Sequence, residues 1–109
     1  MRVTLTDSSK TDIRIISENI MSFSDISDLF VEGIFDKMDL LIETPLIGAS
    51  LQNKIHIDTD YRFLLFELTK KMQYVIIYRV QSFNETVYIN RVFDAREDYL
   101  RILFGDDVD

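Results

Sequence analysis

Arg96 and Tyr99 are the two side chains whose spacing best suits joint action on a phosphate. Residues three apart share one helix face, so a phosphate-binding guanidinium and a proton-exchanging phenol would lie side by side. The structural interpretation, which we favour, pairs Arg96 with Asp94 or Glu97. In it, Tyr99 packs its ring on a sheet and turns its hydroxyl to water. The spacing is compatible with phosphate chemistry but does not require it.

The rest of the composition offers little for catalysis. The chain has no cysteine, which excludes a disulfide framework, a cysteine-based zinc site and a thiol nucleophile. It has one histidine, His56, for which we expect a structural or merely exposed role, with catalysis as the alternative. Nothing in the sequence indicates a metal, a nucleotide or another cofactor.

Acidic residues form a regular pattern in the N-terminal half. They are Asp25, Asp28, Glu32, Asp36, Asp39 and Glu43. Spacings of three and four put these six carboxylates in one line along a helix. A hard cation needs carboxylates that converge on one point, so we interpret the line as a solvated helix face, with a metal or partner site as the alternative. Nucleic acid would be repelled there, and any surface that binds it should lie across the molecule, on the open side of the sheet.

Length and composition predict one packed domain. The chain has 109 residues, 47% of them apolar, with three glycines and one proline, which argues against disorder. We expect a single domain over residues 1–109, with a loose acidic tail at 106–109. The first segment becomes polar after five residues, and no window approaches eighteen consecutive apolar residues. These features predict a cytoplasmic protein without a membrane-spanning segment.

The charge is acidic overall and unevenly distributed. A formal net charge of -7 is unfavourable for nucleic-acid binding, because phosphates are neutralised by Lys and Arg. Between residues 61 and 101, however, seven basic residues stand against five acidic ones. The basic residues are therefore concentrated where Arg96 and Tyr99 lie.

The periodicity predicts an α+β fold. A short strand is predicted over residues 2–5, followed by a helix from about Lys10 and by a second helix. The second helix should end near Glu43, because Thr44 precedes Pro45 and a residue before proline avoids the α conformation. On the first helix the apolar residues are Ile13, Ile16 and Ile20. Helices followed by a run of antiparallel strands, and a final short helix, are typical of an α+β sheet with helices packed on one face.

Three strands are predicted over residues 61–68, 72–80 and 87–93, which are rich in Tyr, Phe, Val and Ile and are joined by polar connections. Alternation along the last strand would place Arg91 on the same face as the apolar Val87 and Ile89. Either a bulge lies near Asn90 or the last strand leaves the core there.

Tyr78-Arg79-Val80 ends one predicted strand, Arg91-Val92-Phe93 ends its hairpin partner, and Asp94-Ala95-Arg96-Glu97-Asp98-Tyr99 follows. In this order and spacing the motifs resemble those of RelE/ParE-type toxins of bacterial type II toxin-antitoxin systems. The resemblance implies the small RelE/ParE-like fold. In that fold the N-terminal strand joins the three C-terminal strands in an antiparallel sheet, with two N-terminal helices on one face and a short C-terminal helix.

The resemblance also implies a toxin that inhibits growth and stabilises plasmids. RelE-like members cut messenger RNA on the ribosome, whereas ParE-like members inhibit DNA gyrase or topoisomerase without hydrolysis. The side chains implied in target binding are Arg62, Arg79, Arg91, Arg96 and Tyr99. If the chain is an enzyme, it is a metal-independent endoribonuclease with Arg62, Arg96 and Tyr99 as its candidates for catalysis. We expect these arginines to cluster on the side away from the acidic helix.

Two departures from the RelE-like pattern favour a ParE-like inhibitor. Val75 follows Tyr74 where RelE-type nucleases often carry Arg, and Asp94 stands where many relatives have His or Tyr. A relative that keeps only antitoxin binding is the third alternative. The first expected partner is the cognate antitoxin, whose contacting segment should be neutral or basic, or held by apolar anchors, because this chain is acidic.

Overall fold

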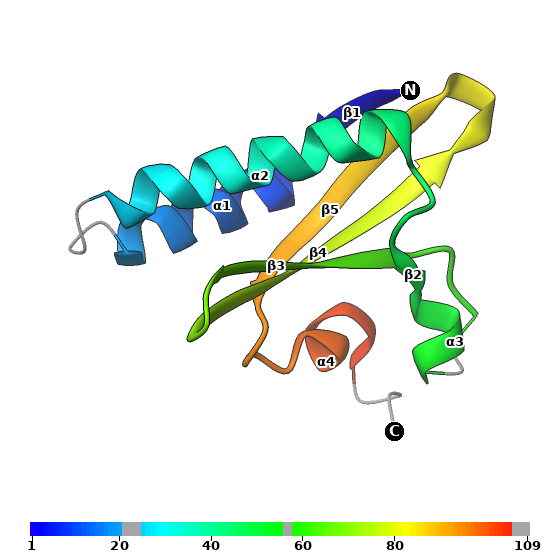
Figure 1. Cartoon of the computed structure of the whole chain (residues 1–109). Helices are drawn as coiled ribbons and strands as arrows, with labels where there is room; N and C mark the ends of the chain where they lie inside the picture. Colours follow the sequence, from blue (N-terminus) through cyan, green and yellow to red (C-terminus); the bar gives the residue numbers. More distant parts are fainter. Residues whose placement is uncertain (21–24, 56–57, 106–109) are drawn as a thin grey trace.

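The computed structural model describes residues 1–20, 25–55 and 58–105, and His56 and the tail 106–109 lie outside the described residues. Helices and strands segregate along the chain, as an α+β fold requires (Figure 1). In chain order the elements are β1 (Arg2–Leu5), α1 (Asp7–Ile20), α2 (Ile26–Glu43), β2 (Ala49–Ser50), α3 (Leu51–Ile55), β3 (Arg62–Thr69), β4 (Met72–Gln81), the 3₁₀ turn η2 (Ser82–Asn84), β5 (Thr86–Asp94) and α4 (Tyr99–Phe104).

The sheet has the strand order β1-β5-β4-β3-β2. The three predicted C-terminal strands pair antiparallel, but β1 runs parallel to β5, so the sheet is mixed and the expectation of a wholly antiparallel sheet is wrong at this edge. A parallel pair needs a long crossover, and both N-terminal helices lie between β1 and β5 to provide it. The other edge carries the short strand β2, from a segment that we expected to be a connector.

Helices α1 and α2 cover the first face of the sheet. Phe30, Ile34 and Leu41 of α2 are buried against Tyr74, Ile76 and Tyr78 of β4, the strand face that alternation predicts. Gly33 lies at the closest approach, since a Cβ there would stand 2.1 Å from Cζ of Phe66. The glycine therefore allows α2 to approach β3 closely.

The second face of the sheet is also covered. Leu51, Val75, Ile77 and Phe93 form a buried cluster beneath α3 and α4, which lie below the sheet in Figure 1. The face that we expected to be open is thus occupied in part by apolar side chains of the terminal helix.

One of the two alternatives for Arg91 is confirmed. The register of β4 and β5 shifts between Ile77 and Tyr78, which pair with Arg91 and Ile89, so Asn90 is the extra residue of a bulge. The bulge places Arg91 on the face of Ile77 and Phe93 instead of the face of Ile89.

Candidate functional site

Arg91 is committed to an ion pair with α1. Its Nε lies 2.7 Å from Oδ2 of Asp12 and its Nη2 lies 3.0 Å from Oδ1. The hydrogen bond to Asp12 raises the pKa of Arg91, and the guanidinium carbon also lies 4.6 Å from the centre of the Phe93 ring. Arg91 therefore fastens α1 to β5.

Arg96 is paired with Asp94, as the structural interpretation predicts. Its Nε and Nη2 lie 3.0 and 2.7 Å from the two oxygens of Asp94, and its backbone N–H donates to Oδ1 at 2.9 Å. These side-chain hydrogen bonds lower the pKa of Asp94 below its usual range. The guanidinium is exposed to solvent but already holds a carboxylate.

Tyr99 begins α4 and stacks its ring on Phe93, with 6.0 Å between ring centres. Its hydroxyl accepts a hydrogen bond from Nζ of Lys54 at 3.1 Å. The ring thus packs on the sheet as expected, while the hydroxyl bonds to a lysine of α3.

Arg62 and Arg79 lie on opposite faces near the same end of the sheet. Arg62 pairs with Tyr78 across the ladder and donates to the backbone oxygens of Gly48 and Leu46, each at 3.0 Å. Arg79 lies on the second face, with its guanidinium carbon 5.6 Å from the Tyr61 ring centre and Nη1 4.0 Å from Asp60.

The predicted arginine cluster is therefore split. Arg79 and Arg91 lie on the face away from α2, whereas Arg62 faces the connector after α2 and Arg96 lies beside Asp94 near the end of α1. Each guanidinium binds a different segment, so the four do not converge on one phosphate.

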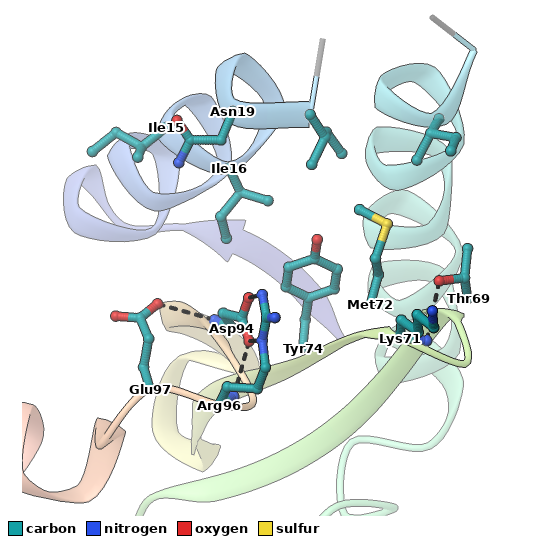
Figure 2. Close-up of a pocket in the computed structure, with 12 residues that line it drawn as sticks. Ile15, Ile16, Asn19, Thr69, Lys71, Met72, Tyr74, Asp94, Arg96 and Glu97 are labelled. Atoms are coloured by element: carbon teal, nitrogen blue, oxygen red, sulfur yellow. Dashed lines mark hydrogen bonds and ion pairs between the residues drawn. The ribbon is translucent and has the colours of Figure 1, made fainter. Parts of the chain in front are cut away.

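A groove beside α1 was not predicted from the sequence. It has a volume of about 660 Å³ and lies between α1, the start of α2 and the ends of β4 and β5 (Figure 2). It is lined by Ile15, Ile16, Asn19, Ile20, Ile26, Thr69, Lys71, Met72, Tyr74, Asp94, Arg96 and Glu97. Apolar side chains form its floor and charged ones its rim, which is the usual composition of a binding site. We call it the α1–β4 groove.

Ile15 carried the signal that could have revealed the groove. It directly precedes Ile16 but lies off the stripe of Ile13, Ile16 and Ile20, which faces the core. Ile15 is 45% exposed, while Ile16 packs against the core. An isoleucine outside the buried stripe of a helix indicates an unoccupied apolar surface.

Tyr74 places a polar group inside the α1–β4 groove. The residue is 3% exposed, and Figure 2 shows its hydroxyl pointing toward Ile16 and away from the sheet. Burial raises the pKa of this hydroxyl, with Asp94 as the second cause. Its oxygen makes no hydrogen bond to any residue that the structure describes, and the ring is held by Phe30 at 4.9 Å.

The acidic line on α2 is a solvated surface. All six carboxylates are exposed, from Asp25 before the helix to Glu43 at its end. Among the described residues, no group of three or more His, Cys, Asp or Glu side chains could hold a metal ion. Within the same ranges, no helix is long and apolar enough to cross a membrane.

The arrangement defines a small α+β protein with an apolar groove beside α1, and the comparisons identify its fold and family. The chain matches a structure described as the chromosomal ParDE toxin-antitoxin system from P. aeruginosa, with a TM-score of 0.65 and 16% identity over 86% of this chain and 95% of that chain. Among curated proteins, none matches the sequence. The family model for the ParE toxin of the type II toxin-antitoxin system, parDE, matches residues 3–99. This chain belongs to the ParE toxin family, and the resemblance to RelE/ParE-type toxins is confirmed.

Proposed function

We propose that this ParE-type toxin inhibits DNA gyrase or a related topoisomerase by binding it as a protein, without hydrolysing nucleic acid, and that it acts in the cytoplasm. Cleavage of RNA without a metal requires a base for the 2′-hydroxyl, an acid for the leaving oxygen and free cations for the phosphorane. The main support for the proposal is that both carboxylate oxygens of Asp94 bind the guanidinium of Arg96. Arg96 is the best candidate for the cation that would stabilise the phosphorane, and this ion pair occupies it.

Arg62 and Tyr99 support the same conclusion. The Nε and Nη2 of Arg62 donate to backbone oxygens, and the Tyr99 hydroxyl is bonded to a lysine of another helix. Arg62 and Tyr99 therefore do not place a general base and a general acid beside one another. A toxin built this way acts through surface contact.

Two assays on the purified chain test the target. We expect it to inhibit DNA supercoiling by gyrase in proportion to its concentration and to leave messenger RNA intact on programmed ribosomes. Cleavage of ribosome-bound messenger RNA, with no effect on supercoiling, would establish a RelE-like endoribonuclease instead. Activity in neither assay, with retained antitoxin binding, would identify a relative that only binds its antitoxin.

The α1–β4 groove is the proposed docking site of the cognate antitoxin. Its lining is largely apolar, and the Tyr74 hydroxyl provides a hydrogen-bonding group inside the groove that a partner can satisfy. An amphipathic helix with large apolar side chains at spacings of three and four fits such a groove. The polar rim, which includes Lys71 and Arg96, would surround these anchors.

Ile15→Ser tests the docking site. The residue lines the groove but is partly exposed, so we expect normal folding and an antitoxin affinity lower by about five- to thirtyfold. Ile102→Ser is the matched control, because Ile102 is 51% exposed and lies on α4, across the sheet. Equal affinity of the Ile15→Ser variant and the wild type in titration calorimetry would place the antitoxin elsewhere.

A further inference from the structure

The tip of the β4–β5 hairpin presents a phenylalanine to solvent. Phe83 is 87% exposed, more than any other large apolar side chain that the structure describes. It occupies the middle of the 3₁₀ turn Ser82–Asn84, at the yellow end of the sheet in Figure 1. A single exposed apolar residue is common, so its surroundings decide whether it is functional.

The tip is rigidly held. Backbone N–H of Glu85 donates to Ser82 O at 3.3 Å, the Thr86 hydroxyl donates to Asn84 O at 3.0 Å, and the Asn84 amide donates to the Tyr88 hydroxyl at 3.1 Å. Glu85 adopts φ 52°, a left-handed conformation that is unfavourable for a residue with a side chain. Strain of this kind persists only where surrounding bonds fix it, and it often marks functional positions.

Other exposed apolar side chains lie at the same end of the molecule. Arg2 N donates to Glu85 O at 3.0 Å, which brings the start of β1 beside the hairpin tip, and Met1 N donates to Ile42 O at 3.4 Å, which brings in the last turn of α2 (Figure 1). Met1 and Ile42 are both exposed, and so are the next apolar residues along the chain, Leu46 and Ile47.

The shape of this surface indicates its partner. A protruding aromatic ring on a fixed turn is complementary to a cavity in the surface of a folded protein. A short antitoxin helix or strand instead fits a groove such as the α1–β4 groove. Exposed Glu43 and Glu85 flank the apolar end together with exposed Arg2 and the Met1 ammonium, so the complementary cavity should have charged side chains of both signs around it.

We propose that Phe83 is the anchor with which this toxin binds its target protein, inserting into an apolar pocket that is rimmed by charged residues of both signs. This inference rests on the proposed function, and its target is therefore gyrase or a related topoisomerase. Binding energy in protein interfaces is concentrated in a few aromatic side chains that enter such pockets. The fixed turn lowers the entropy lost when the ring is immobilised.

Phe83→Ser, measured against purified gyrase, tests the anchor. We expect the half-maximal inhibitory concentration in the supercoiling assay to rise about thirtyfold, the change typical of losing an interface anchor. Phe83→Trp, which keeps an aromatic ring, should retain inhibition to within about threefold. Leu65→Thr is the matched control, because Leu65 is 63% exposed but lies on β3, away from the hairpin tip, and should inhibit like the wild type.

The outcomes separate this inference from the function on which it rests. Wild-type protein that does not inhibit gyrase overturns both. If the wild type inhibits and Phe83→Ser inhibits equally, the function stands and the anchor is overturned. A loss of antitoxin affinity in Phe83→Ser that matches its loss of inhibition also overturns the anchor, because the tip would then serve the antitoxin or the overall fold.

Discussion

Asp12 of α1 holds Arg91 of β5 through two hydrogen bonds and also accepts one from the backbone N–H of Val92 at 2.9 Å. The pairing of β1 with β5 ends at Leu5, opposite Ile89. Beyond that point the Asp12 carboxylate takes the place of a neighbouring strand and accepts the hydrogen bond from the exposed edge of β5. The same side chain thus positions α1 and satisfies a backbone donor. Arg91, an implied target-binding residue, is for this reason a structural residue in the free toxin.

Asp12→Ala is predicted to lower the free energy of unfolding by about 2–4 kcal/mol, because it leaves Arg91 unpaired and the Val92 N–H without its partner. Asp12→Asn should cost less, since its amide oxygen can still accept from Val92. Urea denaturation measures both changes. The control is Glu18→Ala, which removes an exposed pair with Arg14 and should change stability by less than about 0.5 kcal/mol.

Gly33→Ala is predicted to destabilise the protein even though alanine favours helix. The gain in helix propensity is about 1 kcal/mol, but the new Cβ would overlap the Phe66 ring, which packs against both Phe30 and Tyr74. Overpacking of this kind costs about 1–3 kcal/mol, so the net effect should be a loss. Thermal unfolding measures it, and Phe66→Leu in the same chain should recover part of the loss. A more stable Gly33→Ala variant would contradict this packing.

Several features of this fold follow from local sequence, and others do not. The end of α2 at Glu43 follows from Thr44 and Pro45, and the bulge at Asn90 is one of the two alternatives that alternation along the strand left open for Arg91. Helix α1 begins at Asp7, three residues before the predicted start near Lys10, because the Thr6 hydroxyl accepts the capping hydrogen bond from Ser9 N. The direction of β1 depends on the path of a long crossover, which periodicity does not encode.

The candidate site was less predictable than the fold. The pairing of Arg96 with Asp94 follows from proximity in sequence, whereas the partner of Arg91 is 79 residues away. The α1–β4 groove combines side chains of helices and strands that meet only after folding. Family membership, which the sequence motifs indicated, did not require the arginines to cluster.

The Asp94–Arg96 pair predicts a pH dependence of stability. The pKa of Asp94 is depressed in the folded state, so its contribution to stability is present above the unfolded pKa of about 3.9 and is lost as the pH falls through the folded pKa. The unfolding free energies of the wild type and Asp94→Asn should therefore differ near neutral pH and converge below that range. Parallel curves down to acid pH would show that Asp94 makes no such contribution.

Tyr74→Phe separates a structural role of the hydroxyl from a binding role. The hydroxyl has no hydrogen bond to the described residues, so its removal should leave the melting temperature unchanged or slightly higher. If the antitoxin satisfies the hydroxyl, affinity should fall by about five- to tenfold in titration calorimetry. Tyr88→Phe is the control, because that hydroxyl is bonded within the chain to Asn84. Unchanged affinity of Tyr74→Phe would show that the hydroxyl stays unpaired in the complex.

The carboxylates of α2 predict the charge of the antitoxin segment. Asp28 lies close in sequence to Ile26 of the groove, and Glu32 follows one turn later on the same exposed line. A neutral or basic segment, or one held by apolar anchors, can approach this side of the groove without repulsion. For a basic segment, the Asp28→Asn and Glu32→Gln double variant should slow association by about two- to fivefold at low salt and have little effect at high salt, because salt screens exposed charges. Stopped-flow measurement at two salt concentrations tests this, and tight binding of a strongly acidic segment at physiological salt would contradict the charge argument.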